Sequence, residues 1–95
     1  MRHEAATVLE LSRVAELSVL PGETLTKLAR ELERHELGPG EELDVAEQFA
    51  VVLSGLVNGA DGVLHPGDHA SGRLRALTPS AVASCDRSAY EAIAG

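Results

Sequence analysis

The sequence predicts an α+β domain that is mainly β: a small barrel or sandwich with two helices before it and one after it. Two observations lead to this prediction. Up to residue 36 the apolar residues recur at helical spacing, and from residue 37 the chain changes to short Val-rich runs separated by glycines. Six of the nine glycines lie between residues 38 and 67, as expected for turns between strands. A chain of 95 residues has room for one core, so we predict a single domain over residues 1–95.

Two helices are predicted before the β region, over residues 4–20 and 22–36. Apolar residues near one face of the first helix are Val8, Leu11, Val14, Ala15 and Leu17. Pro21 separates the helices, because proline disfavours the helical conformation in the residue before it. The apolar stripe of the second helix consists of Leu25, Leu28, Ala29 and Leu32.

The β region is predicted over residues 37–85, and a closing helix over residues 87–94. The candidate strands are the runs QFAVVL, GLV, GVL and SAVASC. Ser88 and Glu91 have the spacing of a helix capping box, with Asp86 as a competing cap, and Gly95 stands where a helix would stop.

Composition excludes several classes of function. The formal net charge is −7 and Lys27 is the only lysine, whereas nucleic-acid binding needs cations that neutralise phosphates. No apolar run approaches the roughly 20 residues that cross a bilayer, so we expect no membrane insertion. The single cysteine, Cys85, excludes an internal disulfide and fits a reducing compartment. We therefore expect a cytoplasmic protein that binds neither nucleic acid nor membrane.

Several short motifs occur in a characteristic order along the chain. They are Leu20-Pro21 with Leu25, Gly40-Glu41 with Leu43, Val51 to Leu53 followed by Gly55 and Val57, Pro66-Gly67-Asp68, and Ser88 to Ile93. In this order they resemble the cyclic-nucleotide-binding domain of the Crp/Fnr and protein-kinase-A regulatory type, although Leu43 stands one position later than in a strict match. The resemblance covers about residues 8–94 and implies a jelly-roll-like β-barrel.

The resemblance also implies where a ligand would bind. In that family a phosphate-binding cassette follows Pro-Gly-Asp: a short helix directs backbone N–H groups at the cyclic phosphate, an arginine pairs with it, and a glutamate holds the ribose. Here only six residues, His69 to Leu74, separate Asp68 from Arg75, and no glutamate stands near Gly72. That length allows a tight turn between two strands but no helical turn. We therefore predict that the cassette is absent and nucleotide binding lost, with Arg73 and Arg75 pointing outward from an edge strand.

Two alternatives would retain a ligand. A weak cAMP or cGMP sensor would use the remnant of the site, formed by Gly67, Asp68, Gly72, Arg73 and Arg75. A reduced metal-binding cupin would use His65 and His69 with Asp68. The two histidines are four residues apart in a turn, without the His-x-His pair of cupins, so ordinary surface histidines are favoured and no metal site is predicted.

No motif indicates catalysis. Cys85 lies in the apolar run AVASCD, where a free cysteine usually behaves as a small buried hydrophobe. The glycines match neither a nucleotide-binding loop nor a nucleophile elbow. We predict no enzymatic activity, no catalytic residues and no cofactor.

These observations favour a non-catalytic regulatory or interaction module that acts through protein contacts. The partner is expected to be another protein. An acidic face is formed by Glu31, Glu33, Glu36, Glu41 and Glu42; a simply solvated surface is the favoured interpretation, and Glu31, Glu33 and Glu36 are the candidate docking surface for a basic partner. A homodimer through an exposed sheet edge or the first helix is a further possibility. A purely structural domain of a larger assembly is the remaining alternative.

Overall fold

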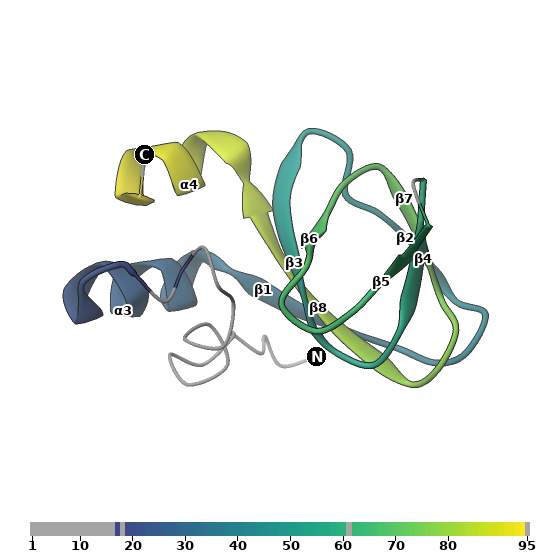
Figure 1. Cartoon of the computed structure of the whole chain (residues 1–95). Helices are drawn as coiled ribbons and strands as arrows, with labels where there is room; N and C mark the ends of the chain where they lie inside the picture. The colour runs from purple at the N-terminus through teal and green to yellow at the C-terminus, as the bar shows by residue number, and fades with distance from the viewer. Residues whose placement is uncertain (1–16, 18, 61, 95) are drawn as a thin grey trace.

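The computed structural model describes residue 17, residues 19–60 and residues 62–94. Two β-sheets lie face to face, and the helices α3 (Gly22–Glu31) and α4 (Arg87–Ala94) lie at one side of the sandwich (Figure 1). The helix predicted over residues 4–20 falls outside the described residues except for its last positions. No helix in the described part of the chain is long and apolar enough to cross a membrane.

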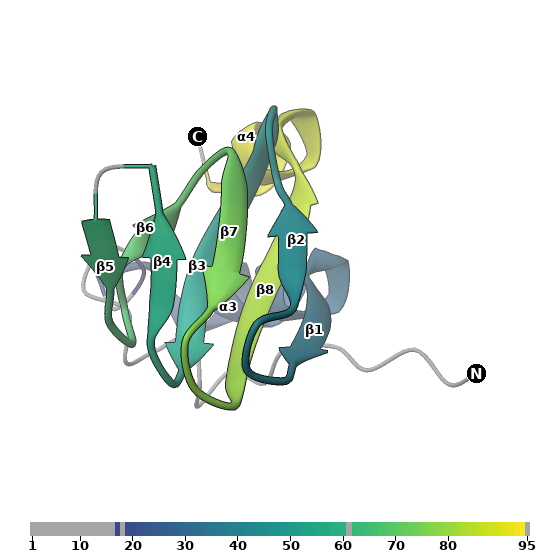
Figure 2. The same ribbon diagram turned by 90° about the vertical axis from the view of Figure 1, so that its right-hand side faces the viewer.

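The eight strands form two four-stranded antiparallel sheets, with the order β1-β8-β3-β6 in the first and β2-β7-β4-β5 in the second. Their bounds are β1 Glu33–Leu37, β2 Glu42–Asp44, β3 Gln48–Ser54, β4 Val57–Gly59, β5 Gly62–Leu64, β6 His69–Ala70, β7 Arg73–Ala76 and β8 Ser80–Asp86. Figure 2 looks onto the second sheet, with the first sheet and then the helices behind it. The predicted mainly β fold is confirmed. The predicted barrel is wrong in one respect: among the described strands no ladder joins the two sheets, so they form a sandwich.

The second helix is shorter than predicted. It ends at Glu31, Leu32 has extended backbone angles, and residues 33–37 form β1 instead of continuing the helix to residue 36. No apolar residue lies between Leu32 and Leu37, so a longer helix would have no stripe to bury there. All five residues pair with β8, which satisfies the backbone groups that face β8, and Leu37 is buried; this tertiary gain outweighs helix propensity.

Two apolar clusters fill the fold, one on each face of the first sheet. The cluster between that sheet and the helices contains Leu17, Leu25, Leu28, Ala29, Leu32, Phe49, Val51, Ala83 and Cys85. The cluster between the two sheets contains Leu37, Val45, Ala50, Val52, Val57, Ala70, Leu74, Ala76 and Val82. Alternate residues of β3 and β8 enter opposite clusters, since successive strand side chains point to opposite faces. Both central strands are therefore buried on both sides, which explains the continuous apolar runs QFAVVL and SAVASC.

The closing helix has the predicted bounds, Arg87–Ala94. Tyr90 and Ile93 pack against the cluster beneath the helices. The Tyr90 ring stacks on Phe49, with 3.8 Å between the ring centroids and 8° between the planes. Phe49 and Tyr90 are the only Phe, Tyr or Trp residues of the chain, and both lie where α4 packs against β3.

Candidate functional site

The segment that would hold a cassette passes directly from one sheet to the other. β6 ends at Ala70, β7 begins at Arg73, and only Ser71 and Gly72 lie between them, without a helical turn. The predicted tight turn is present, but it is a corner rather than a hairpin, since β6 pairs with β3 and β7 with β2 and β4. Gly72 supports this corner with φ +71° and accepts a 2.8 Å hydrogen bond from the Val45 N–H.

The Pro-Gly-Asp turn is held by hydrogen bonds within the fold. The Gly67 N–H donates to the Val52 carbonyl at 2.8 Å, and the Val52 N–H donates to the Asp68 carbonyl at 3.0 Å. The Asp68 carboxylate accepts from the His65 N–H at 2.8 Å and lies 3.7 Å from the His65 ring. Gly67 and Asp68 thus close the turn between β5 and β6 against β3.

Arg73 and Arg75 are exposed on the outer face of the second sheet, while Leu74 and Ala76 between and after them are buried. They do not lie on an edge strand as predicted, because β7 is flanked by β2 and β4. In the ladder with β2, Arg73 stands opposite Asp44 and Arg75 opposite Glu42. Opposite charges in such positions stabilise a sheet by about 0.2–1 kcal/mol per pair. The carboxylates of Asp44 and Glu42 therefore reduce the positive potential that Arg73 and Arg75 would offer to an anionic ligand.

A polar cavity of about 380 Å³ opens at the end of the sandwich nearest the helices. It is lined by Glu31, Glu33, His35, Leu43, Asp44, Gln48, Ser84, Cys85, Asp86 and Ala89. Four of these residues carry carboxylates and none is Lys or Arg. The four carboxylates come from four elements: α3, β1, β2 and β8. We refer to this feature as the acidic cavity.

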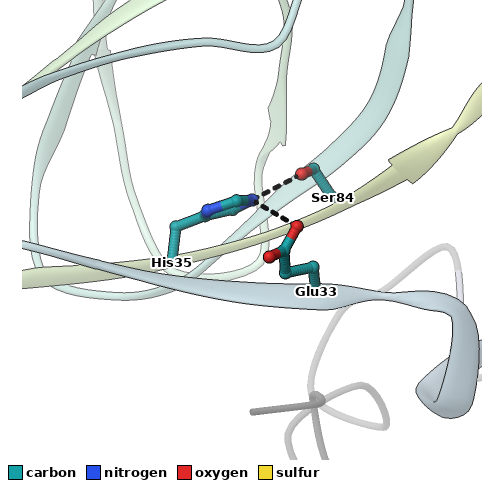
Figure 3. Close-up of polar contacts among 3 residues, drawn as sticks. All are labelled: Glu33, His35 and Ser84. Atoms are coloured by element: carbon teal, nitrogen blue, oxygen red, sulfur yellow. Dashed lines mark hydrogen bonds and ion pairs between the residues drawn. The ribbon is translucent and has the colours of Figure 1, made fainter. Parts of the chain in front are cut away.

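At one wall of the acidic cavity, His35 bridges two residues (Figure 3). Its Nε2 lies 2.9 Å from the Ser84 hydroxyl and 3.9 Å from a Glu33 carboxylate oxygen. A catalytic serine, histidine and acid need the hydroxyl on one ring nitrogen and the acid on the other. Because both partners of His35 lie at the same nitrogen, this arrangement orients the ring and provides no activated nucleophile.

The three glutamates of the predicted docking surface do not share one face. Glu31 and Glu33 line the acidic cavity, whereas Glu36 lines a different cavity, of about 360 Å³, with residues at the end of β3 and at the start of β8. The reason is the change from helix to strand: residues 33 and 36 point to opposite faces of β1. Asp44 and Asp86, rather than Glu36, line the acidic cavity together with Glu31 and Glu33. No sequence signal marks these two aspartates, since the packing of the two sheets brings β2 and β8 to this site.

The histidines of the predicted cupin alternative have other contacts. The His65 ring lies near Asp68, as described above, while His69 stands edge-on to Phe49 with 5.1 Å between the ring centroids. No group of three or more His, Cys, Asp or Glu side chains in the described part of the chain is arranged to hold a metal ion.

Cys85 is buried, as the sequence predicts for a small hydrophobe in an apolar strand. Burial, together with the nearby carboxylates of Glu31 and Asp86, raises the pKa of the thiol from 9.0 to about 11. The reactive form of cysteine is the thiolate, so the native thiol is poorly nucleophilic at neutral pH.

Alkylation of Cys85 by iodoacetamide at pH 8 is expected to be about 100-fold slower in the native protein than in urea, because about 0.1% instead of about 10% is ionised. As pH rises, the thiol of the unfolded chain ionises before the thiol of the folded protein, because its pKa is lower. The buried thiol therefore contributes to folding stability below pH 9, and this contribution is lost as pH rises toward 11. Mass spectrometry measures the rates without ambiguity, since the chain has one cysteine. Equal native and denatured rates at pH 8 would contradict this expectation.

Comparison with solved structures identifies the fold. The chain superposes on a protein kinase A regulatory subunit from Trypanosoma cruzi bound to guanosine with a TM-score of 0.71 and 22% identity, covering 90% of this chain and 39% of that one. A cyclic-nucleotide-binding-like protein from Brucella abortus matches with a TM-score of 0.63 and 21% identity, covering 90% and 95%. The regulatory domain of Toxoplasma gondii protein kinase A with cAMP matches with a TM-score of 0.69 and 17% identity, covering 90% and 42%.

The architecture is thus a two-sheet antiparallel sandwich with helices at one side. More particularly, the chain has the fold of a cyclic-nucleotide-binding domain, as its sequence motifs suggested. It spans about two fifths of the length of the Trypanosoma and Toxoplasma proteins. No protein-family model matches the sequence, and no curated protein matches it either.

Proposed function

We propose that this chain is a non-catalytic regulatory domain that does not bind cyclic nucleotides and that acts through contacts with a protein partner. The observation that carries the first part is the connection of β6 to β7 by Ser71 and Gly72 alone. A phosphate needs converging N–H donors or guanidinium groups. The connection has no helix to supply such donors, and Arg73 and Arg75 stand opposite carboxylates.

Titration calorimetry and thermal unfolding with cAMP and cGMP at millimolar concentration test this part. We expect no heat of binding and an unchanged Tm. A ligand present at its Kd stabilises a folded protein by about 0.4 kcal/mol, and one present at 100 times its Kd by about 2.7 kcal/mol. The regulatory domain from Toxoplasma gondii, whose structure contains cAMP, is the positive control. A saturable Tm increase with either nucleotide would favour the weak-sensor alternative.

The acidic cavity supports the second part of the proposal. Its four carboxylates surround a concave surface that contains no Lys or Arg, so the complementary ligand group is a cation. The guanidinium of an arginine side chain suits such a site, because it offers several donors and pairs with carboxylates in a planar geometry. We therefore propose that the partner presents an arginine in an exposed segment.

The predicted homodimer receives less support. One exposed edge of the first sheet is β1, in which four consecutive residues are polar or charged: Glu33, Arg34, His35 and Glu36. Charged side chains on an edge strand disfavour the addition of a further strand. Association with a basic protein segment at the acidic cavity fits the charge pattern better.

Two charge reversals on β1 test whether the arginine binds at the acidic cavity or on the opposite face of the strand. We expect Glu33→Lys to abolish the chemical-shift changes that a blocked Gly-Arg-Gly peptide causes around the acidic cavity, and Glu36→Lys to leave them unchanged. The two variants are matched: both replace an exposed glutamate of β1, but only Glu33 lines this cavity. NMR titration of the ¹⁵N-labelled protein measures the effect. Loss with Glu36→Lys instead, or no change around the cavity in the wild type, would contradict the proposal.

A further inference from the structure

A third cavity lies between α4 and the first sheet, close to the corner at Ser71 and Gly72. Its volume is about 210 Å³. It is lined by Gln48, Phe49, Ala50, His69, Ala70, Ser71, Arg87, Tyr90 and Glu91. None of the four carboxylates of the acidic cavity belongs to it. We call it the aromatic cavity.

The aromatic cavity concentrates ring surface that the chain has nowhere else. Phe49 and Tyr90 are the only two aromatic residues, and they stack in nearly parallel planes at 3.8 Å. His69 stands almost perpendicular to Phe49, at 81°. Aromatic rings bind other flat rings in offset-stacked or edge-to-face arrangements, beyond the gain from buried area. Phe49 is only 5% exposed, so a planar ligand would meet the margin of this ring group in an edge-to-face arrangement.

The polar groups of the cavity indicate which hydrogen-bonding groups such a ligand would carry at its edge. Gln48 can both donate and accept hydrogen bonds, as can the Ser71 hydroxyl. Arg87 and Glu91 stand four residues apart on α4 and therefore lie on one face of the helix, where they bring opposite charges to the same cavity. These groups match a neutral ring that carries both donors and acceptors. An anion is disfavoured by Glu91 and by the net charge of −7.

The volume limits the size of the ligand. Pockets that enclose drug-sized molecules measure about 300–1,000 Å³. At about 210 Å³, the cavity has room for one or two fused rings but not for a whole nucleotide.

We propose that the aromatic cavity binds a neutral planar nitrogen heterocycle with amide-like donors and acceptors, in edge-to-face contact with the rings of Phe49, His69 and Tyr90 that line it. This site goes beyond the proposed function and does not depend on it, because it uses neither a phosphate-binding segment nor the acidic cavity. It would give the domain a small-molecule input that is independent of cyclic nucleotides.

Nicotinamide is the probe, and cyclohexanecarboxamide is its matched control with the same amide and a saturated ring. In an NMR titration of the ¹⁵N-labelled protein we expect nicotinamide to shift residues 48–50, 69–71 and 87–91, with a Kd on the order of 1 mM for so small a ligand. The ring protons of Tyr90 report directly, because it is the only tyrosine. Cyclohexanecarboxamide is expected to bind at least tenfold more weakly.

Variants then locate the site. Arg87→Ala should weaken nicotinamide binding about fivefold, whereas Arg73→Ala, which removes an exposed arginine outside the cavity, should have no effect. Ser71→Leu fills the rim without changing a core residue and should also weaken binding. The proposal is overturned if millimolar nicotinamide shifts none of these residues, if shifts arise elsewhere, or if the saturated control binds equally well. A cyclic-nucleotide response without any nicotinamide response would overturn both proposals, whereas absence of both responses would overturn only this one.

Discussion

Replacing Gly55 by alanine is expected to lower the free energy of unfolding by about 2–6 kcal/mol. Gly55 follows β3 and has φ +78°, a conformation that costs a residue with a side chain about 1–3 kcal/mol. An added Cβ would also approach the Pro79 carbonyl oxygen and two atoms of Ser80 more closely than 3.0 Å. Overpacking of this kind costs about another 1–3 kcal/mol.

The surrounding loops cannot easily yield to this Cβ. The Leu56 N–H donates to the Thr78 hydroxyl at 3.0 Å, and the Leu56 carbonyl accepts from the Leu77 N–H at 2.9 Å and from the Ser80 hydroxyl at 3.2 Å. The turn after β3 is thus bonded directly to the loop before β8. A domain of 95 residues has a total stability of roughly 5–14 kcal/mol, so the substitution removes a large fraction of it.

Gly40→Ala is the matched control. Gly40 has φ +85°, but nothing lies within 4 Å of the position that its Cβ would occupy. This variant should lose only the backbone contribution of about 1–3 kcal/mol. Urea denaturation followed by circular dichroism measures both values. Equal losses for the two variants would show that the contact with Pro79 and Ser80 has no energetic effect.

The second large effect is expected from Leu74→Ala, with a loss of about 2–5 kcal/mol. Leu74 is fully buried and lies between the two sheets among small aliphatic side chains. The cluster contains no aromatic ring and no methionine that could move into the space, so a cavity would remain.

Leu77→Ala provides the comparison, since Leu77 follows the same strand and is 45% exposed. Its loss should stay within about 0.5 kcal/mol, as for most surface substitutions. The two losses are measured as shifts of the urea midpoint at an unchanged slope, which shows that the denatured states are comparable. A loss for Leu77→Ala as large as that for Leu74→Ala would place the core elsewhere.

Local sequence signals predicted much of the fold correctly. The predicted apolar stripe is buried, with Leu25, Leu28 and Ala29 on α3 and Leu32 directly after it, and α4 has the expected bounds. Glycine turns do separate short strands. The shortness of the segment after Asp68 was also visible in the sequence, because a count of residues limits what a backbone can form whatever surrounds it.

The errors arose where distant segments meet. Residues 33–36 were predicted as helix and form part of β1, because pairing with β8 outweighs a weak local preference. This one change divided the predicted acidic surface, since Glu33 and Glu36 point to opposite faces of a strand. The interior position of β7 was missed for a similar reason: its neighbours β2 and β4 are separated from it in the sequence.

The sequence by itself determined the apolar stripe of the second helix, the turn positions, the apolar runs of the two central strands and the absence of room for a cassette helix. These depend on spacing along the chain, which is fixed by covalent geometry. The tertiary structure alone decided which carboxylates surround the acidic cavity and that Phe49, His69 and Tyr90 meet at the aromatic cavity. Such contacts depend on the pairing of distant strands and on the docking of α4, and these are set by the total burial of the core rather than by any local pattern.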